Sequence, residues 1–165
     1  MVILGIDPGF QFAGFCILKK DGPKTILLDA GYLKMQPTKA ISVRIEQFYA
    51  FFKQKIITCH VNHIALETPF LGKNAQNFLK LGYLRGIIHL LAAQHTLTMH
   101  EFAPQQIKRA ITGFGGASKE QVSRVILNLF VGLKQPEKYD VTDAIAVSVC
   151  GLWHTQQFHL QTTLA

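Results

Sequence analysis

The sequence predicts one α/β domain, built on a mixed five-stranded sheet with helices on both faces. Two early apolar runs separated by an Asp-Gly turn are typical of a β-hairpin, and helical and strand patterns then alternate along the chain. The sequence contains no repeat, low-complexity tract or long linker. Because 165 residues can bury a substantial core, we expect a single domain over residues 1–155 and a flexible C-terminal tail over residues 156–165.

The N-terminal strands begin with an apolar run over residues 2–7. This run is too short for a helix, and Pro8-Gly9 ends it, which places Asp7 at the open end of the sheet. A second strand is predicted over residues 13–18 and a third over residues 24–33. The turn that separates them contains Asp21-Gly22, which favours an antiparallel hairpin.

The remaining elements follow from periodicity and from helix-capping residues. Apolar residues at helical spacing predict a helix over residues 41–56, and Ser118 begins a capping box for a later helix. Pro104 and Gly113 bound a short helix. The other predicted elements are strands at 63–67 and 96–102 and helices at 74–95, 118–130 and 139–153.

The charge balance points to an anionic partner. The chain has 17 basic and 10 acidic residues, a formal charge of +7, which favours nucleic acid over a membrane surface. No stretch is long and apolar enough to cross a bilayer, and the N-terminus lacks a signal-peptide pattern, so we expect a cytoplasmic protein without a membrane partner. Three widely spaced cysteines are expected to be reduced, structural residues.

Four acids are candidates for one shared site. Asp7 and Glu67 each end an apolar strand shortly before a proline, so parallel neighbouring strands would bring both to the same edge. Asp140 and Asp143 are three residues apart at the start of the last helix and share one side of its first turn. The alternatives are that Asp7 caps a turn and that Asp140 caps the helix.

Converging carboxylates in a basic chain indicate a divalent metal centre. The acids would repel one another unless cations neutralised them, and oxygen ligands select Mg²⁺ or Mn²⁺ over zinc. Two such ions about 4 Å apart can activate a water and stabilise the leaving oxygen of a phosphodiester. The sequence contains no convincing nucleophilic triad, so metal-dependent phosphodiester hydrolysis is the predicted chemistry.

Five segments together resemble the RuvC family of Holliday-junction resolvases in order and spacing. They are residues 5–9 (GIDPG), 65–70 (ALETPF), 107–113 (IKRAITG), 117–122 (ASKEQV) and 140–146 (DVTDAIA). The resemblance implies an RNase H-like fold, a homodimer, and paired nicks in opposing strands of a four-way DNA junction. It also implies two Mg²⁺ per subunit, for which Mn²⁺ can substitute, and a branch-migration helicase complex as a partner. The four catalytic, metal-binding acids of the family fall on Asp7, Glu67, Asp140 and Asp143.

The family match also assigns candidate DNA-binding residues. Lys108 and Lys119 correspond to lysines that hold the DNA backbone near the metals, and Phe70 to an aromatic residue that probes the junction centre. Lys73 and Arg109 are added because residues 71–134 carry most of the excess positive charge. The alternatives are ordinary solvated lysines and a phenylalanine buried in the core.

The helix predicted over residues 74–95 is apolar around much of its circumference. This pattern fits a dimer interface, although burial within one subunit is the alternative. Three other functions stay open at this point: an RNase H-like nuclease acting on structured RNA, an ATP-binding domain of the sugar-kinase type, and a junction-binding module without catalysis.

Overall fold

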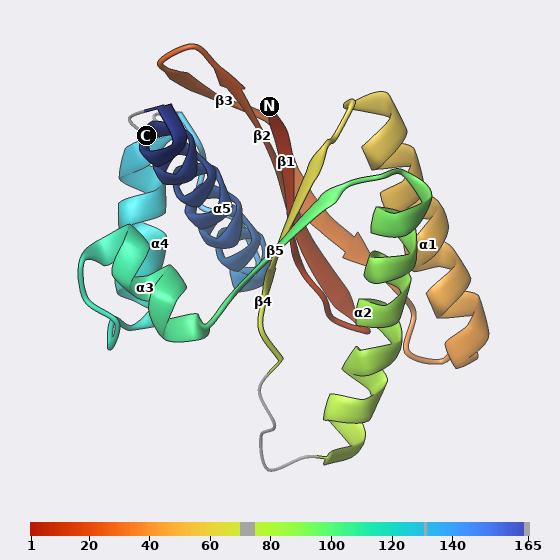
Figure 1. Cartoon of the computed structure of the whole chain (residues 1–165). Coiled ribbons are helices and arrows are strands. Elements are labelled where there is room, and N and C mark those ends of the chain that lie inside the picture. The colour runs from red at the N-terminus through yellow and green to blue at the C-terminus, as the bar shows by residue number, and fades with distance from the viewer. Residues whose placement is uncertain (70–74, 131, 164–165) are drawn as a thin grey trace.

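A mixed five-stranded sheet forms the centre of the molecule (Figure 1). The structure, a computed structural model, describes the backbone of residues 1–69, 75–130 and 132–163, and the side chains of these ranges up to residue 155. The strands lie in the order β3-β2-β1-β4-β5. They are β1 (Val2–Asp7), β2 (Phe12–Asp21), β3 (Lys24–Lys34), β4 (His63–Glu67) and β5 (Thr98–Phe102). β1 pairs antiparallel with β2 and parallel with β4, which confirms the predicted mixed sheet.

The helices cover both faces of this sheet, as predicted (Figure 1). One face packs against α1 (Ile41–Thr58) and α2 (Ala75–Gln94), and the other against α3 (Pro104–Thr112), α4 (Lys119–Leu129) and α5 (Tyr139–Thr163). Each layer encloses its own core cluster, because successive strand residues point to opposite faces. Thus Ile3 belongs to the α5 core and Leu4 to the α1 core.

The apolar stripe predicted for α1 accounts for its packing. Phe48, Phe52 and Ile56 are buried, whereas Ile41, in the first turn, is 40% exposed. The helix therefore docks through its middle and C-terminal turns. Phe52 makes edge-to-face contacts with Phe51 and with Phe15 of β2, which fix the helix against the sheet.

Several boundaries differ from the sequence-based prediction, among them the start of β5, which begins at Thr98 and not at residue 96. α5 continues to Thr163, about ten residues beyond the predicted end near Trp153, because no glycine or proline follows that could stop it. β2 and β3 are longer than expected, and a register shift between Ile17 and Leu18 lets the strands continue past a bulge. The flexibility of the C-terminal tail stays a prediction.

The cysteines and the membrane prediction can be compared with the described residues. Cys16 and Cys150 are buried, Cys59 is partly buried, and all three are free thiols. Within the described ranges, none of the helices combines the length and the apolarity that a bilayer span requires.

Candidate active site

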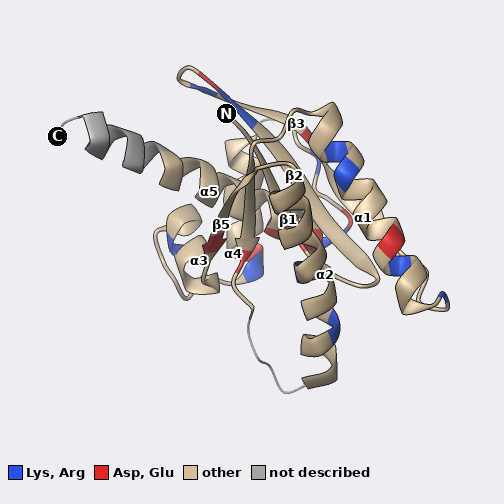
Figure 2. Ribbon diagram, turned by 45° about the vertical axis from the view of Figure 1, so that its right-hand side comes forward, with Lys and Arg blue, Asp and Glu red and all other residues tan. Residues whose placement is uncertain are grey.

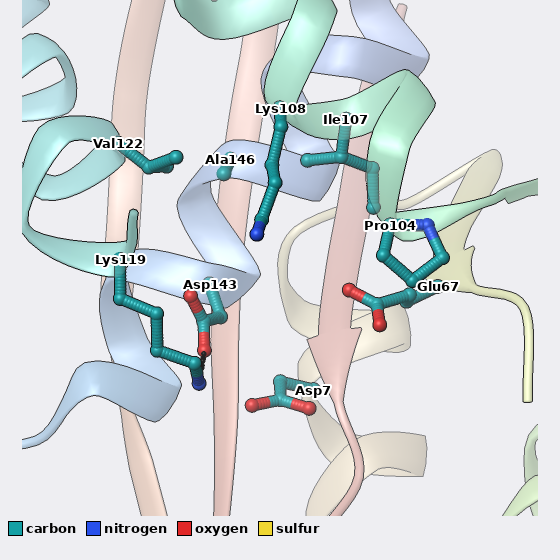
Figure 3. Close-up of a pocket in the computed structure, with 9 residues that line it drawn as sticks. All are labelled: Asp7, Glu67, Pro104, Ile107, Lys108, Lys119, Val122, Asp143 and Ala146. Atoms are coloured by element: carbon teal, nitrogen blue, oxygen red, sulfur yellow. Dashed lines mark hydrogen bonds and ion pairs between the residues drawn. The ribbon is translucent and has the colours of Figure 1, made fainter. Parts of the chain in front are cut away.

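Two acids lie side by side at the carboxyl ends of β1 and β4. The strands are parallel neighbours, with Ile6 paired to Leu66, so the next residue of each strand emerges at the same edge of the sheet. These residues are Asp7 and Glu67, which both project into one cavity (Figure 3). The prediction that parallel strands bring the two acids together is confirmed.

α5 adds a third acid, Asp143, to this edge, because glycine residues in the strands allow the helix to lie directly on them. Gly14 of β2 pairs with Asp7, and a Cβ atom on Gly14 would lie 1.9 Å from the backbone carbonyl oxygen of Asp140. Further along α5, a Cβ atom on Gly5 of β1 would lie 2.0 Å from the buried Ser148 hydroxyl oxygen. This close packing brings the first turn of α5 beside Asp7.

The acids share a cavity of about 260 Å³ with two lysines (Figure 3). Lys108 enters from α3 and Lys119 from α4, so five separate elements contribute charged groups. The lining comprises Asp7, Glu67, Pro104, Ile107, Lys108, Lys119, Val122, Asp143 and Ala146. Figure 2 shows acidic and basic segments next to each other in this part of the molecule.

Asp7 is the most strongly perturbed acid of the site. Burial, together with the charges of Asp143, Asp140 and Glu67, raises the pKa of Asp7 to about 7, and the charge of Lys119 opposes this shift. Asp140 does not line the cavity, yet it lies near enough for its charge to act on Asp7. A carboxyl group with this pKa exchanges protons close to neutral pH.

Glu67 shows a weaker form of the same effect. Partial burial raises the pKa of Glu67, and the charge of Asp143 raises it further. Lys119, Lys108 and Arg85 lower it. The side chain also keeps contact with solvent, so it can receive a cation or a substrate from the open side.

Lys119 forms an ion pair with Asp143, with 2.7 Å between Nζ and Oδ2. Hydrogen bonding to this carboxylate raises the pKa of Lys119. The lysine stands at the start of α4, where Ser118 and Gln121 form the predicted capping box. The ammonium group is therefore the cation that neutralises Asp143 in this structure.

In the part of the chain that the structure describes, no three His, Cys, Asp or Glu side chains are arranged closely enough to hold a metal ion. The donor set nevertheless has the right chemistry, since three carboxylates face one cavity and Lys119 already occupies a cation position at Asp143. A metal that bound Asp143 through Oδ2 would take the place of the Lys119 ammonium group.

Arg85 is a site residue that sequence reasoning missed. From α2, its guanidinium donates to the backbone carbonyl oxygen of Glu67 at 2.7 Å and forms an ion pair with Glu101 of β5. The Arg85 side chain is only 12% exposed. An arginine one residue after the buried Leu84, in a helix predicted to be apolar around much of its circumference, was the available signal.

The predicted DNA-binding residues separate into three groups. Lys108 and Lys119 line the cavity. Arg109 is exposed and lies outside it. Phe70 and Lys73 lie outside the described residues.

Comparisons with known proteins connect this fold and this site to one family. A family model described as crossover junction endodeoxyribonuclease RuvC matches residues 3–151. The protein of that name from Pelodictyon phaeoclathratiforme is 38% identical over 152 residues, which cover 92% of this chain and 80% of the relative. The protein of that name from Natranaerobius thermophilus is 34% identical over 164 residues, which cover 99% of this chain and 100% of the relative.

Solved structures give the same result for the fold. The structure of Thermus thermophilus RuvC matches with a TM-score of 0.85 at 23% identity, covering 95% of this chain and 96% of that chain. The structure of T. thermophilus RuvC in complex with Holliday junction substrate has a TM-score of 0.88, with the same identity and coverage. The predicted RNase H-like fold is confirmed.

Proposed function

Because the chain belongs to the RuvC family of crossover junction endodeoxyribonucleases, we propose that it resolves four-way (Holliday) DNA junctions by symmetric nicks in two opposing strands. The observation that carries this proposal is the cavity in which Asp7, Glu67 and Asp143 meet Lys108 and Lys119. Carboxylates of this kind serve phosphodiester hydrolysis, and the lysines match the charge of a DNA backbone. The relative solved with a Holliday junction substrate has the same fold.

The proposal includes divalent cations held by Asp7, Glu67 and Asp143, with Asp140 beside them. Hard oxygen donors favour Mg²⁺, with Mn²⁺ as a substitute, and we propose two ions per subunit. Bound cations would supply an activated water and neutralise charge on the phosphate. The raised pKa of Asp7 supports a cation site, because acids gathered at this density are costly without added positive charge.

The chain's own cations would bind and orient the scissile strand. Lys119 would exchange its contact with Asp143 for a contact with a backbone phosphate once a metal neutralises that carboxylate. Lys108, on α3, would hold the same strand from the other wall of the cavity. Phe70 remains a proposed contact to the junction centre, based on the family match alone. Lys73 remains a proposed DNA contact, based on the positive charge of residues 71–134.

The test is a nicking assay on a synthetic four-way junction with Mg²⁺, with Ca²⁺ as the control cation. Asp7→Asn should abolish nicking while junction binding persists, because the variant loses a metal ligand and keeps the basic surface. Asp21→Asn, which makes the same chemical change in the β2–β3 hairpin, should nick normally. Normal nicking by Asp7→Asn would rule out the mechanism, and equal cleavage of structured RNA would contradict the DNA substrate.

We also propose that two copies pair through α2. Leu79, Tyr83 and Leu90 lie on one stripe of this helix and are 61%, 45% and 46% exposed. Gly86 lies on the same stripe, and a Cβ atom there would meet nothing within 4 Å, which leaves room for a partner helix to approach. A symmetric junction has two scissile strands, and two-fold pairing supplies two active sites.

Sedimentation analysis tests this pairing. Tyr83→Glu should convert the protein to a monomer, because it would bury two charges at a two-fold interface. Leu28→Glu, an equally exposed apolar position on β3, should leave the mass unchanged. A wild-type monomer at working concentration would contradict the dimer. We further propose that the protein is located in the cytoplasm and that it works with a branch-migration helicase complex.

A further inference from the structure

The loop between α3 and α4 presents an aromatic side chain to solvent. Phe114 is 65% exposed, more than any other large apolar side chain in the described ranges. A phenylalanine left in water forgoes about 1.5–3 kcal/mol of burial free energy. Contacts within the loop hold Phe114 in this exposed position.

The loop fixes the position of this ring. The Thr112 hydroxyl accepts a hydrogen bond from the Phe114 N–H at 3.2 Å and lies 2.8 Å from the Lys108 carbonyl oxygen, to which it can donate. The ring lies over Gly116, since a Cβ atom there would be 2.7 Å from it. Phe114 is therefore held outward on a short connection whose two ends are anchored in helices.

Two arginines lie near this ring. The Arg109 guanidinium lies 3.7 Å from the position that a Cβ atom on Gly115 would occupy, beside Phe114. Arg124 of α4 joins Phe114 in lining a shallow hollow of about 280 Å³. Both arginines are exposed, and neither forms an ion pair with any residue that the structure describes.

The charge around the loop and its position favour a nucleic acid partner. Residues 104–130 contain four basic residues and one acidic residue. The same loop connects the helices that carry Lys108 and Lys119 into the catalytic cavity. The loop that carries Phe114 is therefore close in the chain to both lysines of the cavity.

We propose that Phe114, Arg109 and Arg124 form a docking surface for the sugar–phosphate backbone of a DNA arm adjoining the cavity. Two guanidinium groups close to one apolar ring match the phosphates and the deoxyribose of a DNA backbone. The arginines bind the phosphates, and the phenyl ring packs on the sugar between them. This contact is independent of base sequence. The inference rests on the proposed function, because it takes junction DNA as the substrate.

Binding measurements in an Asp7→Asn background test this surface, because junctions stay intact there. Phe114→Ala should weaken binding roughly 5–20-fold, and Phe114→Tyr, which keeps the ring, should restore it. Arg124→Gln should weaken binding similarly and reduce the slope of log affinity against log salt by about 1. Leu129→Ala, at a 47% exposed position of the same helix, and Lys24→Gln, on the hairpin, are the matched controls.

The outcomes separate the docking surface from the proposed function. Equal losses on an isolated duplex arm and on the junction support a backbone contact. A loss confined to the junction overturns it, because the ring would then be contacting an unpaired base. Unchanged affinity of Phe114→Ala and Arg124→Gln overturns the proposal while leaving junction cleavage intact. Failure of the wild-type protein to nick any junction would instead contradict the proposed function.

Discussion

The guanidinium of Arg85 donates a hydrogen bond to the backbone carbonyl oxygen of Glu67 at 2.7 Å. It also pairs with Glu101, so one side chain of α2 connects the ends of β4 and β5. Glu67 is the last residue of its strand, and the bond from Arg85 adds to the pairing of its backbone with Phe102 of β5. The arginine therefore holds a proposed metal ligand in place from the helix that we assign to the dimer interface.

Replacing Arg85 should impair turnover more than binding. Arg85→Gln leaves the Glu67 carbonyl without its donor, and we expect nicking to fall roughly 10–100-fold with junction affinity within about 2-fold of wild type. The nicking rate of Arg85→Lys should lie between those of the wild type and Arg85→Gln, because one ammonium group cannot contact both Glu67 and Glu101. Glu101→Gln, which removes only the ion pair, is the control. Wild-type turnover by Arg85→Gln would exclude the positioning role.

Magnesium binding should release protons near neutral pH. With a pKa of about 7, metal-free Asp7 is about half protonated at pH 7, and a cation displaces that proton. Affinity for Mg²⁺ should therefore rise between about pH 6 and about pH 8. Titration calorimetry in two buffers of different ionisation enthalpy measures the released protons. The Asp7→Asn variant should release fewer, and equal release by both proteins would contradict the assignment.

Removing the Asp7 charge should stabilise the metal-free protein. Its pKa in the folded state is about 7, above the ordinary 3.8, so the folded state binds the proton more tightly than the unfolded state. The stability from this protonation is complete at low pH and is lost as pH rises through about 7. In EDTA at pH 8 we expect Asp7→Asn to raise Tm by roughly 3–8 °C, and by less at pH 5. A Tm gain that is larger at pH 5 than at pH 8 would contradict this prediction.

Gly14 should tolerate no side chain. A Cβ atom there would lie 1.9 Å from the Asp140 carbonyl oxygen, which is backbone and cannot rotate away. We expect Gly14→Ala to cost about 2–4 kcal/mol in unfolding free energy and to abolish nicking, because the start of α5 must move with Asp143. In Gly82→Ala the new methyl group meets nothing within 4 Å, so a stability gain of up to about 1 kcal/mol is expected. Denaturant titration compares the two.

Much of this arrangement could be predicted because it is local. The Pro8-Gly9 stop, the alternation of helices and strands, and the Ser118 capping box each depend on neighbouring residues, and each is found in the structure. The convergence of Asp7 and Glu67 also followed from sequence, because parallel strands place their carboxyl ends together. The end of α5 was predicted too early, since helix termination without glycine or proline leaves a weak signal.

The residue types, their order and their family were determined by the sequence alone. The tertiary structure decided which charges neutralise one another. The ion pair of Lys119 with Asp143, the bond from Arg85 to Glu67 and the exposure of Phe114 join or orient groups through packing between separate elements. Such contacts depend on how closely helices approach the sheet. That distance is set by side-chain volumes across the interface, such as the missing Cβ of Gly14, and it leaves no periodic signal along the chain.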